Sequence, residues 1–314
     1  MTEFAFVFPG QGCQTIGMLA KLAAENFQIE KTFYEASDVL GYDLWRLVQK
    51  GPIEKLNKTY HTQPALLAAS VSIYRIWQSK KGIVPSFMAG HSLGEYSALV
   101  CAGALNFTDA IKLVELRGEI MQEAVPEGTC TMKAIIGLDR ESIQKACKKS
   151  AQDQVVCSVN FNGFDQVVIA GHNEAVNRAV QRCKAAGAKR IVPLQVSIPS
   201  HCKLMKSASN KLQVALKSIV FKKPIVPVIN NVDVRCETNP EAIRSALVRQ
   251  LYNPVRWTEV VEFIALQGIK HFLEIGPSKV LTGLTKRIID TLNVASVNDP
   301  DSLTAAMTQQ LEGN

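Results

Sequence analysis

Two kinds of hydrophobic pattern alternate along most of this chain. Short apolar runs are typical of strands buried inside a parallel sheet, and the segments between them carry apolar residues at the spacing of one helix face. The expected strands of this kind are residues 4–8, 84–89, 226–230 and 271–275. Such an alternation of strands and helices predicts an α/β fold with a mostly parallel sheet.

The pattern changes between residues 128 and 197. It predicts, in order, a strand, a helix, two strands, a helix and a strand at residues 132–137, 140–150, 155–160, 166–170, 174–186 and 190–196. This βαββαβ order is ferredoxin-like. We therefore expect a small subdomain of residues 128–197, inserted into a large domain that residues 1–127 and 198–314 form together. A ligand cleft is expected between the two.

A serine stands between two glycines at residues 90–94, in the sequence GHSLG. The expected strand before it and an Ala- and Leu-rich helical segment after it, residues 95–104, indicate a nucleophile elbow. Glycines flank such a serine because a Cβ there would collide with the neighbouring strand or helix. The same pattern also occurs by chance in surface loops. The context favours Ser92 as a nucleophile in a large domain that is α/β-hydrolase-like.

A serine nucleophile needs a base, and the chain has five histidines. His91 adjoins the serine, but neighbouring side chains in an extended strand point to opposite faces. His201 lies in SIPSHC, where the chain would leave the small subdomain and re-enter the large domain. We interpret His201 as the candidate general base, with a purely structural role as the alternative. No acidic residue stands out as a third member of a triad.

Two backbone N–H groups are candidates for an oxyanion hole. In elbow enzymes one comes from the residue after the nucleophile, here Leu93, and the other from a loop that follows an early strand. The sequence PGQG after the first expected strand supplies such a loop around Gln11. A plain strand-ending turn is the alternative for this loop.

Arg117 lies on the apolar face of an expected helix at residues 108–124. Its neighbours three and four positions away are Leu113, Val114, Ile120 and Met121. Arginine is rarely buried without a partner. The guanidinium either pairs with an internal carboxylate or binds a carboxylate of the substrate, which would select an acyl group that carries its own negative charge.

Composition and charge narrow the function classes. The chain has 314 residues, 47% of them hydrophobic and 20% charged, with a net charge of +7. It lacks basic runs interleaved with aromatics, an apolar run long enough for a membrane span, a dinucleotide or P-loop motif, and zinc-like cysteine spacing. We therefore expect a cytoplasmic enzyme without nucleic acid, membrane or metal. The positive charge suits an acidic protein or a phosphorylated ligand, or reflects ordinary solvated lysines.

Several segments together carry a family resemblance, and they are FVFPGQGCQ, GHSLGEYSAL, LVELRGEIMQ, PSHC, LVRQLYNPVRW and EIGPSKVLTGL. Over nearly its whole length and in the same order, the chain resembles the malonyl-CoA:acyl carrier protein transacylases of type II fatty acid synthesis. The resemblance implies ping-pong transfer of malonyl from malonyl-CoA to the phosphopantetheine thiol of acyl carrier protein, for fatty acid biosynthesis. CoA would be the product, and no bound cofactor or metal would be needed.

The resemblance also implies roles for individual residues. Ser92 would be the nucleophile, His201 the base, Gln11 and Leu93 the oxyanion hole, and Arg117 the ligand of the malonyl carboxylate. The family orients its histidine through a backbone carbonyl, and the matching position here is Gln250. Residues that would line the pocket are Met121, Met132 and Asn162.

Three alternatives stay open. The first is an acyltransferase with another acyl-CoA preference, such as acetyl or methylmalonyl. The second is a serine thioesterase or hydrolase, which would have a recognisable acid between serine and histidine in the chain. The third is a carrier-binding module without catalysis, in which the elbow is only a packed turn.

Overall fold

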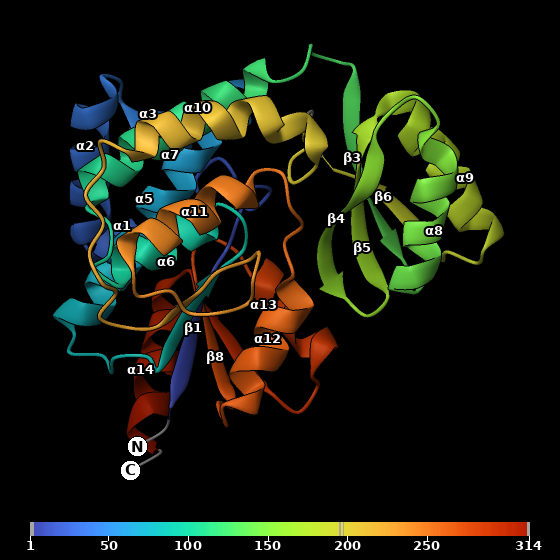
Figure 1. The fold of residues 1–314 in the computed structure, drawn as a ribbon. Coiled ribbons are helices and arrows are strands. Elements are labelled where there is room, and N and C mark those ends of the chain that lie inside the picture. The colour runs from blue at the N-terminus through green and yellow to red at the C-terminus, as the bar shows by residue number, and fades with distance from the viewer. Residues whose placement is uncertain (1–2, 195, 197, 313–314) are drawn as a thin grey trace.

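Two separate sheets organise the chain in a computed structural model that describes residues 3–194, 196 and 198–312 (Figure 1). The larger sheet has five strands in the order β7-β2-β1-β8-β9, and every paired strand in it is parallel. Its strands are β1 (Phe4–Phe8), β2 (Phe87–Gly90), β7 (Val228–Ile229), β8 (His271–Ile275) and β9 (Asn293–Val297). The prediction of an α/β fold with a mostly parallel sheet is confirmed.

Helices cover both faces of this sheet because successive side chains of each strand point to opposite sides. Phe4, Phe6 and Phe8 of β1 belong to one apolar cluster, and Ala5 and Val7 belong to another. The helices that contribute to the cluster around the three phenylalanines are α1 (Ala20–Glu25), α2 (Gln28–Leu40), α3 (Leu44–Lys50), α4 (Ile53–Leu56), α5 (Thr59–Ser79), α6 (Gly94–Cys101), α7 (Phe107–Glu123), α10 (Lys206–Leu216), α11 (Pro240–Gln250) and α14 (Pro300–Glu312). The helices on the other face are α12 (Trp257–Leu266) and α13 (Val280–Ile288).

The second sheet has four antiparallel strands in the order β4-β5-β3-β6. Its elements are β3 (Cys130–Ile136), α8 (Arg140–Ala151), β4 (Val156–Gly163), β5 (Gln166–His172), α9 (Asn173–Ala185) and β6 (Arg190–Pro193). Numbered within the unit, the spatial order is 2-3-1-4, so the predicted ferredoxin-like order is confirmed. Helices α8 and α9 pack on one face (Figure 1). The other face, with Met132 and Val159, packs against Cys202.

Several strand boundaries differ from the sequence prediction, mainly because of proline. The strand expected at 84–89 begins only at Phe87, since Pro85 has no N–H to donate and Val84 is 72% exposed. The strand expected at 226–230 shrinks to Val228–Ile229, directly after Pro227. Strand β6 ends at Pro193, and residue 195 of the expected strand and residue 197 at the expected domain boundary lie outside the described residues.

Strand β9 is missing from the sequence prediction. Its sequence, NVASV, mixes polar and apolar residues, and the strand lies at the edge of the parallel sheet beside β8. An edge strand is covered less completely than a central one, so it does not need the continuous apolar run by which the other strands were predicted.

Among the described residues no helix has the length and apolarity to cross a bilayer. The same residues contain no cluster of three histidine, cysteine or acidic side chains that could hold a metal ion. All eight cysteines are unpaired, and six of them are buried.

Candidate active site

The parallel register of β1 and β2 brings two loops together at one edge of the sheet. Phe8, the last residue of β1, pairs with Gly90, the last residue of β2. The chain then continues from β1 into the loop that contains Gln11 and from β2 into the turn that contains Ser92. Sites in parallel α/β sheets form at this carboxyl edge.

Ser92 sits on a sharp turn between β2 and α6 with a φ of 52°, a conformation that non-glycine residues rarely adopt. The turn is tight on both sides: a Cβ on Gly90 would lie 1.8 Å from the carbonyl carbon of Gly94, and a Cβ on Gly94 would lie 2.0 Å from the carbonyl oxygen of Phe8. Asn231 secures the turn, because its Oδ1 accepts from the Ser92 N–H at 2.8 Å and its Nδ2 donates to the Gly90 carbonyl at 2.7 Å. This is the geometry of a nucleophile elbow.

The hydroxyl of Ser92 faces His201, with Oγ 2.8 Å from Nε2 of the ring. On the other side of the ring, Nδ1 lies 2.7 Å from the backbone carbonyl of Gln250. A carbonyl can only accept, so Nδ1 carries the ring proton and Nε2 presents its lone pair to the serine O–H. His201 is itself in the left-handed region, with a φ of 64°. Strain of this kind concentrates at functional sites.

The environment keeps this imidazole neutral. Burial first, and the nearby positive charge of Arg117 second, lower the pKa of His201 to about 3 from its ordinary 6.5. Both effects disfavour the charged ring. At neutral pH His201 is therefore able to accept a proton from Ser92.

Arg117 is almost completely buried, with 1% of its surface exposed. Its Nη1 donates to Oε1 of Gln63 at 2.7 Å, and its Nη2 donates to Oε1 of Gln250 at 3.1 Å and to Oγ of Ser92 at 3.3 Å. Its Nε has no hydrogen-bond partner in the part of the chain that the structure describes. Of the two alternatives for Arg117, an internal ion pair is wrong for the described residues, since none of their carboxylates lies within 4 Å.

The N–H groups of Gln11 and Leu93 donate to no acceptor among the described residues. Both residues line the same hollow as Ser92. Leu93 is also the N-cap residue of α6, where the helix dipole favours a negative charge. Two free N–H groups beside a serine hydroxyl fit the requirements of an oxyanion hole.

The hollow at Ser92 is narrow, about 60 Å³, and lies between the two sheets. Met121 of α7 lines it from the large domain, and Met132 of β3 lines it from the small sheet. Asn162 does not line it. Its Oδ1 instead lies 2.8 Å from Nε2 of His91, whereas Asn160 on the same strand faces the hollow.

Four polar residues of this site were missed in the sequence: Gln63, Glu95, Asn160 and Asn231. Only Glu95 gave a signal, because it follows the serine by three residues in the first turn of a helix. The other three come from elements remote in the chain, and nothing in their local sequence distinguishes them.

The remaining histidines serve the structure. Nδ1 of His61 lies 3.0 Å from the hydroxyl of Tyr42, and Nδ1 of His172 accepts from the Val155 N–H at 3.0 Å. His271 starts β8, and its ring packs against Phe4.

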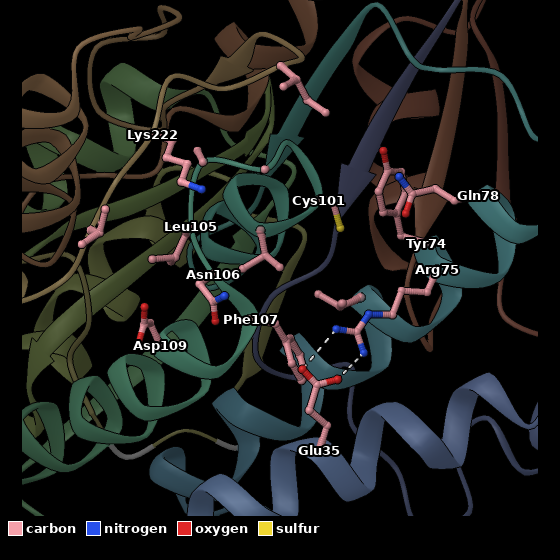
Figure 2. A pocket seen from close by; sticks show the side chains of 16 residues that line it. Glu35, Tyr74, Arg75, Gln78, Cys101, Leu105, Asn106, Phe107, Asp109 and Lys222 are labelled. Atoms are coloured by element: carbon pink, nitrogen blue, oxygen red, sulfur yellow. Dashed lines mark hydrogen bonds and ion pairs between the residues drawn. The ribbon is translucent and has the colours of Figure 1, made fainter.

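A second and larger hollow, of about 660 Å³, lies elsewhere in the fold and shares no residue with the first. Figure 2 shows side chains that line it, among them Arg75, which pairs with Glu35 at 2.6 Å. The Arg75 guanidinium also lies 4.6 Å from the ring centre of Phe107. Two of its charged groups, Arg75 and Glu35, are thus paired with each other, and it holds neither Ser92 nor His201, so its size does not make it the better candidate for the chemistry.

The sequence matches the profile of the acyl transferase domain family over residues 5–311. It is similar to the malonyl CoA-acyl carrier protein transacylase of Salmonella typhimurium, with 66% identity over 309 residues that cover 98% of this chain and 100% of the relative. The corresponding protein of Bacillus subtilis is 42% identical, with 100% of this chain and 99% of the relative covered.

Solved structures agree. A malonyl-transacylase in complex with a type II PKS acyl-carrier protein has a TM-score of 0.97 and 66% identity, and the match covers 98% of this chain and 100% of that one. An acyl carrier protein S-malonyltransferase from Vibrio cholerae has a TM-score of 0.94 and 60% identity, over 97% of this chain and 99% of its own. With these matches over its whole described fold, this chain belongs to the family of malonyl CoA-acyl carrier protein transacylases.

Proposed function

We propose that this protein transfers the malonyl group of malonyl-CoA to the phosphopantetheine thiol of acyl carrier protein. The transfer passes through a malonyl ester of Ser92, and its product, malonyl-acyl carrier protein, serves fatty acid biosynthesis. One observation carries this proposal above all. The hydroxyl of Ser92 contacts both a neutral histidine, at 2.8 Å, and a buried arginine, at 3.3 Å, that has no carboxylate partner among the described residues.

In the first half of the reaction, Nε2 of His201 takes the proton of the Ser92 hydroxyl as Oγ attacks the thioester carbonyl. The N–H groups of Gln11 and Leu93 stabilise the oxyanion, and each is worth on the order of 3 kcal/mol. The C–S bond then breaks, and the imidazolium returns the proton to the departing thiolate of CoA. The product of this half is CoA and the malonyl ester of Ser92.

The second half runs the same steps with another thiol. The pantetheine thiol of the carrier protein gives its proton to His201 and attacks the ester carbonyl, and Oγ of Ser92 leaves and takes the proton back. One site can serve both halves because CoA and the carrier protein end in the same pantetheine arm.

Arg117 supports malonyl as the acyl group. A planar guanidinium binds a carboxylate through two parallel hydrogen bonds, and a buried cation without an anionic partner is costly until such a ligand arrives. An acyltransferase that prefers acetyl would gain nothing from this buried charge. Methylmalonyl is the second candidate for the acyl group, and whether it fits depends on the space beside Met121 and Met132 in the hollow.

The other two alternatives have less support. A hydrolase of the elbow type orients its histidine through an acid, whereas Nδ1 of His201 faces the carbonyl of Gln250. A carrier-binding module without catalysis would not need a histidine to be held 2.8 Å from the hydroxyl of Ser92.

Three further points belong to this proposal. Residues 1–127 and 198–314 would form the catalytic domain, and residues 128–197 the small subdomain. No bound cofactor or metal would take part, because Ser92 and His201 supply the chemistry. The protein would work in the cytoplasm, where its eight free cysteines would stay reduced.

The test is the intact mass of the purified protein after brief incubation with malonyl-CoA, followed by addition of holo acyl carrier protein. We expect one malonyl adduct on the wild type, none on Ser92→Ala, and transfer of the adduct to the carrier protein. An adduct that is lost to water at the same rate with and without carrier would indicate a hydrolase. An adduct from another acyl-CoA, but none from malonyl-CoA, would overturn the substrate and leave the mechanism.

A further inference from the structure

Glu95 is a buried carboxylic acid beside the site to which the mechanism above gives no task. It lies in the first turn of α6 with 2% of its surface exposed. Among the described residues, no lysine or arginine lies within 4 Å of its carboxylate. Burial without a paired charge is costly, so the position requires an explanation.

One oxygen of Glu95 accepts two hydrogen bonds from residues that are remote in the chain. Its Oε2 accepts from the side-chain Nε2 of Gln250 at 2.8 Å and from the backbone N–H of Asn231 at 2.9 Å. Each of these two residues holds a different part of the site.

Gln250 is the link to His201 and Arg117. Its backbone carbonyl accepts from Nδ1 of His201, and its side-chain Oε1 accepts from Nη2 of Arg117. A flipped side-chain amide would turn its NH₂ group toward the guanidinium, which also can only donate. Nε2 of Gln250 donates to Oε2 of Glu95 at 2.8 Å and to the Ser92 carbonyl at 3.1 Å, and these two acceptors oppose the flip because each requires Nε2 on its own side.

Asn231 is the link to the serine. Its backbone N–H is held by Glu95, and its side chain holds both the Ser92 N–H and the Gly90 carbonyl. The position of Asn231 therefore determines how the elbow presents the Ser92 hydroxyl.

We propose that Glu95 is a positioning residue, whose Oε2 fixes Gln250 and Asn231 together and so sets the distance between Ser92 and His201. This inference rests on the proposed function for the reaction that it serves. Glu95 would take the part that the acid plays in a serine triad, but it acts through Gln250 and does not touch the imidazole.

The acceptor matters here more than the charge. Burial raises the pKa of Glu95 to about 7, while the hydrogen bonds from Asn231 and Gln250 and the charge of Arg117 oppose the rise. A proton on Oε1 would leave Oε2 free to accept both bonds. A glutamine at position 95 can place its amide oxygen in the same position and keep both bonds.

The experiment compares wild type with Glu95→Gln, Glu95→Asp and Glu95→Ala in two measurements. The first is the rate at which malonyl-CoA acylates Ser92, followed by rapid quenching and intact mass. The second is the NMR signal of the His201 Nδ1 proton, which reports the hydrogen bond to Gln250 and does not depend on the acyl substrate. Thermal unfolding of each variant identifies a loss of fold.

We expect Glu95→Gln to acylate within about 5-fold of wild type with the His201 signal unmoved. Glu95→Ala should acylate Ser92 about 10²-fold more slowly than wild type, since misplacing the reacting groups by about 1 Å costs a rate factor of this size. It should also shift the His201 signal. Glu95→Asp keeps the charge but is one methylene shorter, so it should lie below Glu95→Gln. If Glu95→Ala fails to fold, the comparison of Asp with Gln carries the test.

Two outcomes would overturn the proposal. One is a folded Glu95→Ala protein with wild-type acylation and an unmoved His201 signal. The other is Glu95→Asp matching or exceeding Glu95→Gln, which would make the charge the decisive property. A wild-type protein that takes no malonyl would instead overturn the proposed function, and the NMR comparison would still test the positioning.

Discussion

Nη2 of Arg117 lies 3.3 Å from Oγ of Ser92, so the buried cation and the candidate nucleophile are in direct contact. A carboxylate that binds this guanidinium must therefore lie within a few bonds of the carbon that Oγ attacks. Malonyl, with one methylene between carboxylate and thioester, meets this condition, whereas a longer diacid would have to fold back on itself in a hollow of about 60 Å³.

Replacing Arg117 with alanine should remove the preference for malonyl over acetyl. Loss of one side of a buried ion pair costs about 2–5 kcal/mol, which corresponds to a fall of about 30-fold to several thousand-fold in kcat/KM for malonyl-CoA. The measurement is kcat/KM for both acyl-CoAs. Arg75→Ala is the control, because Arg75 is another partly enclosed arginine, but it is paired with Glu35 and lines the other hollow. An unchanged malonyl to acetyl ratio in Arg117→Ala would contradict the assignment.

His201→Ala should slow the acylation of Ser92 by about 10²–10⁴, the usual contribution of a general base. Rapid-quench intact mass with malonyl-CoA measures the rate. The control is His172→Ala, which removes an imidazole at the end of β5 that accepts from the Val155 N–H and is remote from Ser92 in the chain. We expect that control to acylate normally, and equal loss in both variants would remove His201 from the mechanism.

The acid limb of kcat/KM should lie well below the ordinary histidine pKa of 6.5. His201 acts as a base only when neutral, and its pKa is lowered to about 3, so acidification should not protonate it between pH 7 and 5. Arg117→Ala removes one cause of the lowering and should shift the limb toward neutral pH. The check is a pH profile with circular dichroism at each pH, and a wild-type limb at 6.5 or above would contradict the burial argument.

The same lowered pKa makes a prediction for stability. A histidine whose pKa is lower in the folded state binds fewer protons there than in the unfolded chain. Above pH 6.5 both states leave His201 neutral and it costs no folding stability, whereas below pH 6.5 protonation of the unfolded chain lowers the free energy of unfolding. Replacing His201 with asparagine should therefore reduce the loss of stability between pH 6.5 and 4. Urea unfolding of both proteins across this range measures it, and parallel curves would be the contrary result.

Gly94→Ala should destabilise the fold by about 3 kcal/mol or more, since the new Cβ would lie 2.0 Å from the Phe8 carbonyl oxygen in rigid backbone. Gly283→Ala in α13 is the control. Its Cβ would meet only the end of the Arg287 side chain at 3.9 Å, and alanine in a helix interior gains up to about 1 kcal/mol over glycine. Urea unfolding of both variants gives the comparison, and similar stabilities would refute the tight elbow.

Local patterns in the sequence were sufficient for the outline of the fold. All five residues of β1 are buried and apolar, and such a continuous apolar run is the sequence pattern of a strand buried on both faces, so β1 could be predicted directly. The βαββαβ order needed only periodicity and turns, and the antiparallel sheet follows from it. The edge strand β9 and the true starts of β2 and β7 could not be predicted in this way, because pairing to a neighbour and the missing N–H of proline decide them.

The candidate site divides in the same manner. The sequence determined which residues carry reactive chemistry: a serine between glycines, a histidine after a proline, and an arginine on an apolar helix face. Only the tertiary structure decided that Ser92, His201 and Arg117 meet, and that Gln63, Asn231 and Glu95 surround them beside the Gln250 that the family resemblance had indicated. The physical reason is that amide and carboxyl groups gain their roles from contacts across 54 to 158 residues of chain, which leave no period or motif in the local sequence.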